Sequence, residues 1–228
     1  MRTKTIIVAS ASVVAAATTT QSCVALATSA VGIAVLKKVL LGGITKGLGI
    51  FADKNSFLAN RLIDAAMPSQ LRELNNTLEK IGLGNLVQKE REYIAQAAAF
   101  TVDVSRPVLV NAVNSLTAED VTRIVQGGSG TATKLLREKT ETQLMAAIAP
   151  RVDAKLNEYG IVQTLNSAMA GNNLFGSIFG GQQNASNSLT SGISRLAAQQ
   201  MVNGLFNIIE QHEQQNAVTL QNALQQNR

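Results

Sequence analysis

The chain is poor in the residues on which most enzyme sites are built. Its 228 residues include one cysteine, one histidine and no tryptophan. A histidine or cysteine metal cluster, or a nucleophile paired with histidine, would therefore have to use His212 or Cys23. His212 lies among glutamines on the polar side of a predicted helix, and we interpret it as a solvated surface residue. These absences predict no cofactor and no metal, and they disfavour an enzyme, although carboxylates from distant segments could still meet in a cleft.

Charge is also scarce, because charged residues make up 15% of the chain. The formal net charge is +5, and it falls to +3 if Arg2 and Lys4 are removed with an export signal. A balance this small does not indicate a nucleic-acid partner. Aromatic residues, at 4%, are too few to predict a stacking surface for bases or sugars.

The N-terminus has the pattern of an export signal. Arg2 and Lys4 precede a run without charge that reaches Leu36, and residues 6–17 have the length and apolarity of a signal-peptide core. The polar residues 18–22 interrupt this run, which disfavours the alternative of a transmembrane helix. We therefore predict that residues 1–22 are a signal peptide.

Two cleavage sites compete within five residues. Ser22 before Cys23 fits a relaxed lipoprotein site, in which Cys23 carries the lipid, whereas Ala25 and Ala27 fit ordinary cleavage after Ala27. We favour the lipoprotein, because a lone thiol has no disulfide partner in an oxidising compartment. The expected location is the cell envelope, as a periplasm-facing protein held to the membrane by its lipid, with a soluble periplasmic protein as the alternative.

Hydrophobic spacing is helical throughout and predicts an all-α fold, a single bundle-like domain of about seven to nine helices over residues 31–213. The first helix is expected over residues 31–41, with the glycines at 42, 43, 47 and 49 making its continuation irregular. A short helix over residues 55–66 should follow, and Pro107 should kink or restart a later one. Apolar stripes are expected at Leu71, Leu74, Leu78 and Ile81, and at Leu144, Ile148, Val152, Leu156 and Tyr159.

Composition changes after residue 160, where charge nearly disappears and asparagine and glutamine become frequent. Residues 171–188 are predicted to be a flexible loop rich in asparagine, glutamine and glycine. A last helix should run from Leu189 to about Gln214, with a loosely ordered tail over residues 214–228. Its broad apolar face is expected to consist of Ile193, Leu196, Ala197, Met201, Leu205, Ile208 and Ile209.

The most distinctive stretch is a glycine-rich corner between two predicted helices. Thr117 is expected to cap the first helix, which should stop at Gly127 and Gly128, and Ser129 and Thr131 are expected to cap the second. Such a corner can bind an anion or can be purely structural, and we favour the structural interpretation because no strand precedes it and the phosphate-loop spacing is missing. The candidate residues are Gly127, Gly128, Thr131, Thr133, Arg137 and Thr140. We predict that Arg137 and Thr140 point back at the loop or its flanking helix and fix the angle between the two helices.

Several short runs together resemble a known family over roughly residues 33–213. They are Leu36-Lys37-Lys38-Val39-Leu40 with Gly43, Met67-Pro68-Ser69-Gln70-Leu71, Ile124-Val125-Gln126-Gly127-Gly128 and Gly204-Leu205-Phe206. This pattern resembles the bacterial envelope family catalogued as domain of unknown function 4197, and it is densest over residues 127–140. The resemblance implies an export or lipoprotein signal and a mostly helical body, and it implies no activity. The chain departs from it at Ser129 and Gly130, where an acidic residue is usual, and at Leu135 and Leu136, which replace two aromatic residues.

Three functional hypotheses follow. The first is a non-catalytic structural or protein-binding module of the cell envelope. The second is a carrier of an apolar ligand, such as a lipid, in a cavity between alanine- and leucine-rich helices. The third is an enzyme with a site near Arg137.

Overall fold

In a computed structural model, the chain is a single all-α domain, which confirms the predicted fold class. The structure describes residues 30–160, 163–164, 167 and 185–219, and these contain helices and turns but no strand. The predicted signal peptide, Cys23 and residues 171–184 of the predicted loop lie outside these residues. Within the described part of the chain, no helix combines the length and apolarity needed to cross a bilayer.

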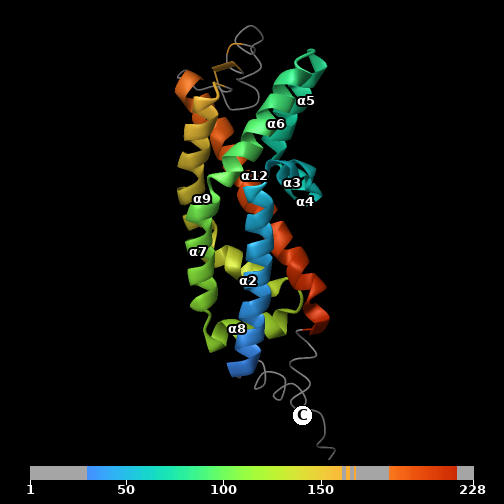
Figure 1. The fold of residues 1–228 in the computed structure, drawn as a ribbon, viewed down its shortest axis with the longest axis vertical. Helices are drawn as coiled ribbons and strands as arrows, with labels where there is room; N and C mark the ends of the chain where they lie inside the picture. The colour runs from blue at the N-terminus through green and yellow to red at the C-terminus, as the bar shows by residue number, and fades with distance from the viewer. Residues whose placement is uncertain (1–29, 161–162, 165–166, 168–184, 220–228) are drawn as a thin grey trace, which may run out of the picture.

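Two long helices form the centre of the body. Helix α2 (Ala30–Ala52) and helix α12 (Ala185–Gln215) pack against each other, and α12 crosses behind α2 in Figure 1. The apolar face predicted for α12 is confirmed, since Ile193, Met201 and Leu205 are completely buried. Helix α12 begins four residues before the predicted start at Leu189.

The predicted irregularity of the first helix is wrong, because α2 continues through all four glycines to Ala52. Three of them lie where α12 approaches most closely. A Cβ on Gly43 would come 3.2 Å from the Cα of Ile209, and a Cβ on Gly47 would come 2.5 Å from Cδ1 of Leu205. Each glycine lowers the intrinsic stability of α2 by about 1 kcal/mol, and the close packing of α2 against α12 offsets this loss.

Helices α3 (Lys54–Ala59) and α4 (Arg61–Ala65) replace the single helix predicted over residues 55–66. The break falls at Asn60, whose Oδ1 accepts the N–H groups of Leu62 and Ile63 and so caps α4. Amides of α12 hold this segment, since Gln200 and Asn207 donate to the carbonyls of Ile63 and Leu62.

Helices α5 (Ser69–Lys80) and α6 (Gly84–Ala99) form a hairpin at the upper right of Figure 1. The predicted stripe of α5 is confirmed at Leu71, Leu74 and Leu78, but Ile81 is 42% exposed because the helix ends at Lys80.

The chain next breaks at Phe100 and Thr101 and not at Pro107, which lies inside α7 (Val102–Asn114). Helix α8 (Ala118–Gly127) crosses the lower end of the body, and α9 (Thr131–Glu158) returns beside α7 and α12. The predicted stripe of α9 is fully buried from Leu144 to Leu156, whereas Tyr159 follows the end of the helix and is only partly buried. Helices α2, α7, α9 and α12 therefore enclose one core, and the glycine-rich corner lies where α8 turns into α9.

Candidate functional site

The corner between α8 and α9 is built by backbone geometry that only glycine adopts readily. Helix α8 ends at Gly127, and Gly128 and Gly130 follow with φ of 76° and 87°. Gly127 is needed for space, because a Cβ there would lie 2.5 Å from Oγ1 of Thr131. At the other end of α8, the predicted cap is confirmed, since the Thr117 hydroxyl accepts the N–H of Asp120 and the Asp120 carboxylate accepts the N–H of Thr117.

The predicted caps of α9 are wrong. Its N-cap is Gly130, which has no side chain, and the carboxylate of Glu213 on α12 takes the place of a capping hydroxyl. Oε1 of Glu213 accepts the N–H groups of Gly130 at 2.9 Å and Ala132 at 3.2 Å. Oε2 accepts the N–H of Thr133 at 2.8 Å and its hydroxyl at 2.6 Å. We call this set of four hydrogen bonds the Glu213 clamp.

The clamp bears on the alternative that the corner binds an anion, which the sequence left open. Free amides at a helix N-terminus favour negative charge, and here that charge comes from the chain itself, about 80 residues away in sequence. Glu213 is 3% exposed and both its oxygens are occupied. A carboxylate so placed is shielded from solvent, and its hydrogen bonds hold the start of α9 against α12.

We predicted that Arg137 points back at the loop or its flanking helix, and its partners lie on α9 itself and on α12. Its guanidinium donates to Oδ1 of Asn203 at 3.0 Å, lies 3.5 Å from Glu141 and sits 4.7 Å above the Phe206 ring centroid. The Thr140 hydroxyl donates to the carbonyl of Leu136, one turn earlier in α9, so this hydrogen bond stays within α9. Both side chains therefore leave the angle between α8 and α9 to other groups.

That angle is fixed by two ion pairs across the corner. Lys139 lies 3.1 Å from Asp120, and Arg123 lies 2.9 Å from Glu138. The Asp120 side chain is 13% exposed, so its pair with Lys139 is better shielded from solvent than the other. The corner is thus a structural joint with three attachments: the clamp, the Arg137 contact and these ion pairs.

A shallow hollow of about 340 Å³ remains open beside the joint. It is lined by Ser129, Gly130, Thr131, Thr133, Lys134, Arg137, Phe206 and Glu210. Lys134 is exposed and has no charged partner among the described residues. The hollow could receive a polar group. The acid that lines it is Glu210, whose Oε1 accepts a hydrogen bond from Gln214 at 3.2 Å, and the buried Glu213 is not among its lining residues.

The lone histidine is not the solvated surface residue that we predicted. His212 is half-buried, and its Nε2 lies against α2, where a Cβ on Gly42 would come within 2.7 Å of it. Burial, together with the nearby Lys46 charge, lowers the pKa of His212. No group of three or more histidines, cysteines and acids in the described ranges could hold a metal ion.

A second buried carboxyl lies between α5 and α6. Glu90 is 1% exposed, and the Asn75 amide donates to its Oε2 at 3.4 Å. Burial raises the pKa of Glu90 to about 7, against the opposing effects of the Asn75 hydrogen bond and the Arg91 charge. Oε1 of Glu90 and Oδ1 of Asn75 have no hydrogen-bond partner, so this pair is incompletely satisfied.

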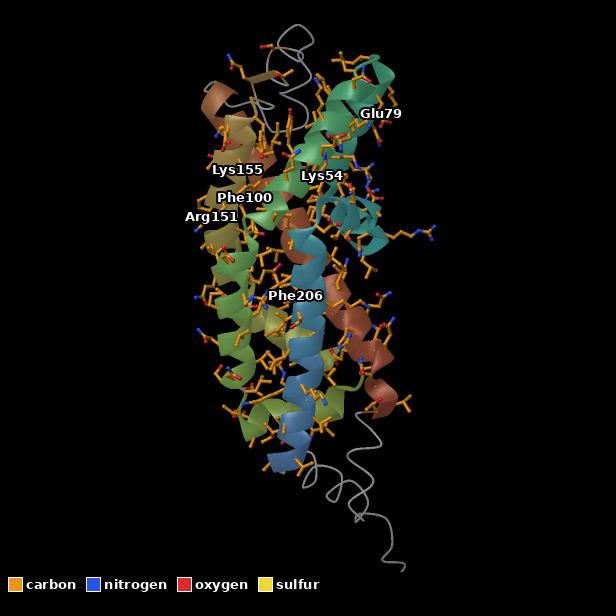
Figure 2. The ribbon with its side chains drawn as sticks, in the orientation of Figure 1. Lys54, Glu79, Phe100, Arg151, Lys155 and Phe206 are labelled. Carbon is orange, nitrogen blue, oxygen red and sulfur yellow. The ribbon has the colours of Figure 1, made fainter. Side chains whose placement is uncertain are left out.

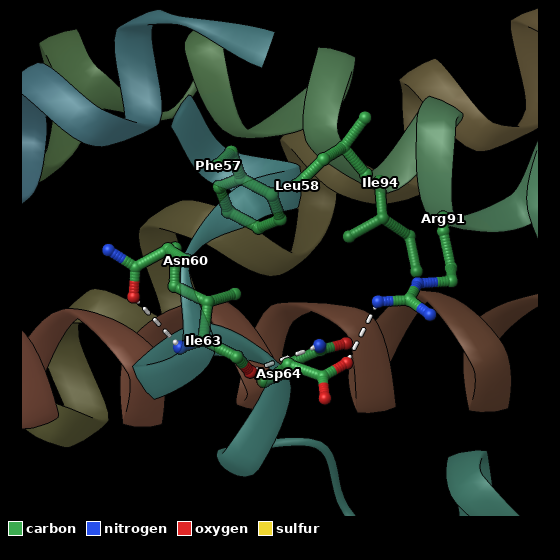
Figure 3. Close-up of a pocket in the computed structure, with 8 residues that line it drawn as sticks. Phe57, Leu58, Asn60, Ile63, Asp64, Arg91 and Ile94 are labelled. Carbon is green, nitrogen blue, oxygen red and sulfur yellow. Dashed lines mark hydrogen bonds and ion pairs between the residues drawn. The ribbon is translucent and has the colours of Figure 1, made fainter. Parts of the chain in front are cut away.

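The small hollow in Figure 3 bears on the carrier hypothesis. It lies between α3, α4, α6 and α12, next to the Arg91–Asp64 ion pair, and Phe57, Ile63 and Gln200 are among its lining residues. Its volume is about 20 Å³, which is room for roughly one water molecule. Oε1 of Gln200 lacks a partner and would suit such a water. The space is too small for a lipid chain.

Sequence reasoning missed the residues of α12 that complete the corner, namely Asn203, Phe206, Glu210 and Glu213. One pattern in the sequence could have identified Glu213. Residues 205, 208 and 209 predict the inward face of α12, and one further turn places Glu213 on that face. A carboxylate there requires buried donors, and the glycine-rich N-terminus of α9 supplies them.

Comparison with known proteins gives a family but no activity, ligand or partner. The model of the family described as "Protein of unknown function (DUF4197)" matches residues 27–222. No curated protein and no solved structure matches the chain.

Proposed function

The chain belongs to this DUF4197 family, and we propose that it is a non-catalytic protein-binding module of the bacterial cell envelope, tethered through a lipid on Cys23. The observation that carries the proposal is the Glu213 clamp. The part of the chain where the family pattern is densest is a joint between helices, and its carboxylate and helix amides satisfy each other. This arrangement fits a rigid body that presents surfaces better than it fits a reactive centre.

The position of α2 supports the tether. Ala30 lies at the lower end of the elongated body in Figure 1, and Cys23 precedes it by seven residues. Seven extended residues span at most about 25 Å. A lipid on Cys23 would therefore keep this end near the membrane and direct the α5–α6 hairpin away from it.

The two alternatives have less support. A carrier needs an enclosed apolar cavity, whereas the hollow beside Gln200 holds about one water and the hollow at the corner is open to solvent. An enzyme near Arg137 needs a cation free to contact substrate. The guanidinium already contacts Asn203, Glu141 and the Phe206 ring, which favours a structural role for it.

The tether is tested by metabolic labelling with palmitate. We expect label in the wild type and none in Cys23→Ala, while the two proteins keep the same helical circular dichroism. An unlabelled wild type whose N-terminus follows Ala27 would contradict the tether and indicate a soluble periplasmic protein. Mass spectrometry of organic extracts from the purified protein tests the carrier alternative, since a stoichiometric apolar ligand would replace the binding-module proposal.

A further inference from the structure

An apolar hollow with a cationic rim lies at the break between α6 and α7, against the C-terminal half of α9. Its volume is about 350 Å³. The lining residues are Phe100, Ala147, Pro150, Arg151, Ala154 and Lys155. Figure 2 shows Phe100, Arg151 and Lys155 together at the upper left of the body.

The exposed ring of Phe100 distinguishes this hollow. Phe100 is 45% exposed, whereas Phe51, Phe57 and Phe206 are at most 4% exposed. The alanines and Pro150 of α9 form a smooth apolar floor beside the ring, without long side chains to fill the space. An aromatic or branched aliphatic side chain from a partner would cover both the ring and the floor.

The positive charge of the rim indicates that a partner also carries acidic side chains. The two charged residues that line the hollow, Arg151 and Lys155, are both cationic. Lys155 lies 4.2 Å above the Phe100 ring centroid and pairs with Glu158 at 2.7 Å. The Arg151 side chain is exposed, and its guanidinium has no ion pair or hydrogen bond with another described residue. Its guanidinium offers a planar pair of donors that suits a carboxylate.

We propose that this hollow, the Phe100 site, binds an acidic protein segment that places an apolar side chain on Phe100 and a carboxylate on Arg151. The choice of a protein over an anionic lipid surface rests on the proposed tether. Helix α2 begins at the lower end of the body, whereas the labelled Phe100 lies in its upper half, so a tethered molecule holds the site away from the membrane (Figures 1 and 2).

The test uses the whole protein with 4-fluorophenylalanine in place of its phenylalanines. The ¹⁹F signal of Phe100 is identified by its loss in Phe100→Leu. We expect the peptide acetyl-Asp-Glu-Leu-Phe-Asp-Glu-amide to shift this signal, and the same peptide with lysines in place of its acids to leave it unchanged. Arg151→Glu should weaken peptide binding at least tenfold. Arg61→Glu, a charge reversal at an exposed arginine of α4, should not change it.

Vesicles of phosphatidylglycerol in phosphatidylcholine form the second arm. Binding to vesicles that Arg151→Glu abolishes would overturn the proposal in favour of a lipid surface. Equal shifts with the acidic and the basic peptide, or no shift with either, would also overturn it. The measurement is repeated on Cys23→Ala, so that failure of the tether and failure of the Phe100 site are distinguished.

Discussion

Replacing Glu90 with glutamine should stabilise the protein at neutral pH and above. The carboxyl group is buried between α5 and α6, and Oε1 of Glu90 and Oδ1 of Asn75 lack partners. Glutamine has nearly the same shape, cannot ionise, and could exchange two hydrogen bonds with the Asn75 amide. The substitution therefore removes a buried charge without creating a cavity.

The pH dependence follows from the direction of the pKa shift. Burial raises the pKa of Glu90 from 4.5 to about 7, so the folded protein holds the proton more tightly than the unfolded chain. The contribution of Glu90 to stability is therefore fully present below pH 4.5, and it is lost as the pH rises to about 7. At 1.36 kcal/mol per pKa unit, the loss is roughly 3 kcal/mol.

Urea unfolding followed by circular dichroism at pH 4.5 and pH 8 measures this effect. Other groups titrate alike in both proteins, so the pH-dependent difference between Glu90→Gln and wild type isolates Glu90. We expect Glu90→Gln to gain roughly 3 kcal/mol more at pH 8 than at pH 4.5. Glu92→Gln is the matched control, because its carboxylate is at the surface beside Lys54. The same stability difference at both pH values would refute the reasoning.

Three further substitutions test the packing of α12. Glu213→Ala leaves the first amides of α9 without an acceptor in a buried place, and thermal unfolding should show a loss of about 3–5 kcal/mol; a loss below 1 kcal/mol would contradict the clamp. Gly43→Ala should have a free energy of unfolding about 1–3 kcal/mol lower than that of Gly49→Ala. The reason is that a Cβ at Gly43 meets the α12 backbone, whereas one at Gly49 meets nothing within 4 Å. Equal free energies of unfolding would show that α2 and α12 can move apart with little loss of stability. Arg137→Ala should lower the melting temperature through lost contact with Asn203 and Phe206, and an unchanged value would revive a ligand-binding role for the arginine.

The periodic spacing of apolar residues was sufficient to predict which faces of the helices are buried. The stripe from Leu144 to Leu156 and the inward face of α12 are buried as predicted, because a helix with one apolar face has one way to bury it. The cap at Thr117 was equally predictable, since its partner is three residues away.

Features that depend on distant partners were not predictable in this way. The glycines of α2 indicated a weak helix by propensity, yet Gly43 and Gly47 lie where α12 packs, and tertiary contact overrides propensity. The break at Phe100 carries no proline or glycine, whereas Pro107 is accommodated within α7. Pairing of Glu90 with Asn75 likewise depends on how the α5–α6 hairpin closes.

The Glu213 clamp joins a buried carboxylate to buried helix amides, and each of these would destabilise the folded protein if the other were absent. A carboxylate on the buried face of α12 without donors would be strongly destabilising, and so would buried amides of α9 without an acceptor. Each supplies what the other lacks, so α9 and α12 have one favourable register, set by the position of Glu213 against Gly130 and Thr133. The residues of the corner therefore specify the fold. A partner is better sought on surfaces that the fold leaves uncovered, and the Phe100 site, with its exposed ring and unpaired Arg151, is such a surface.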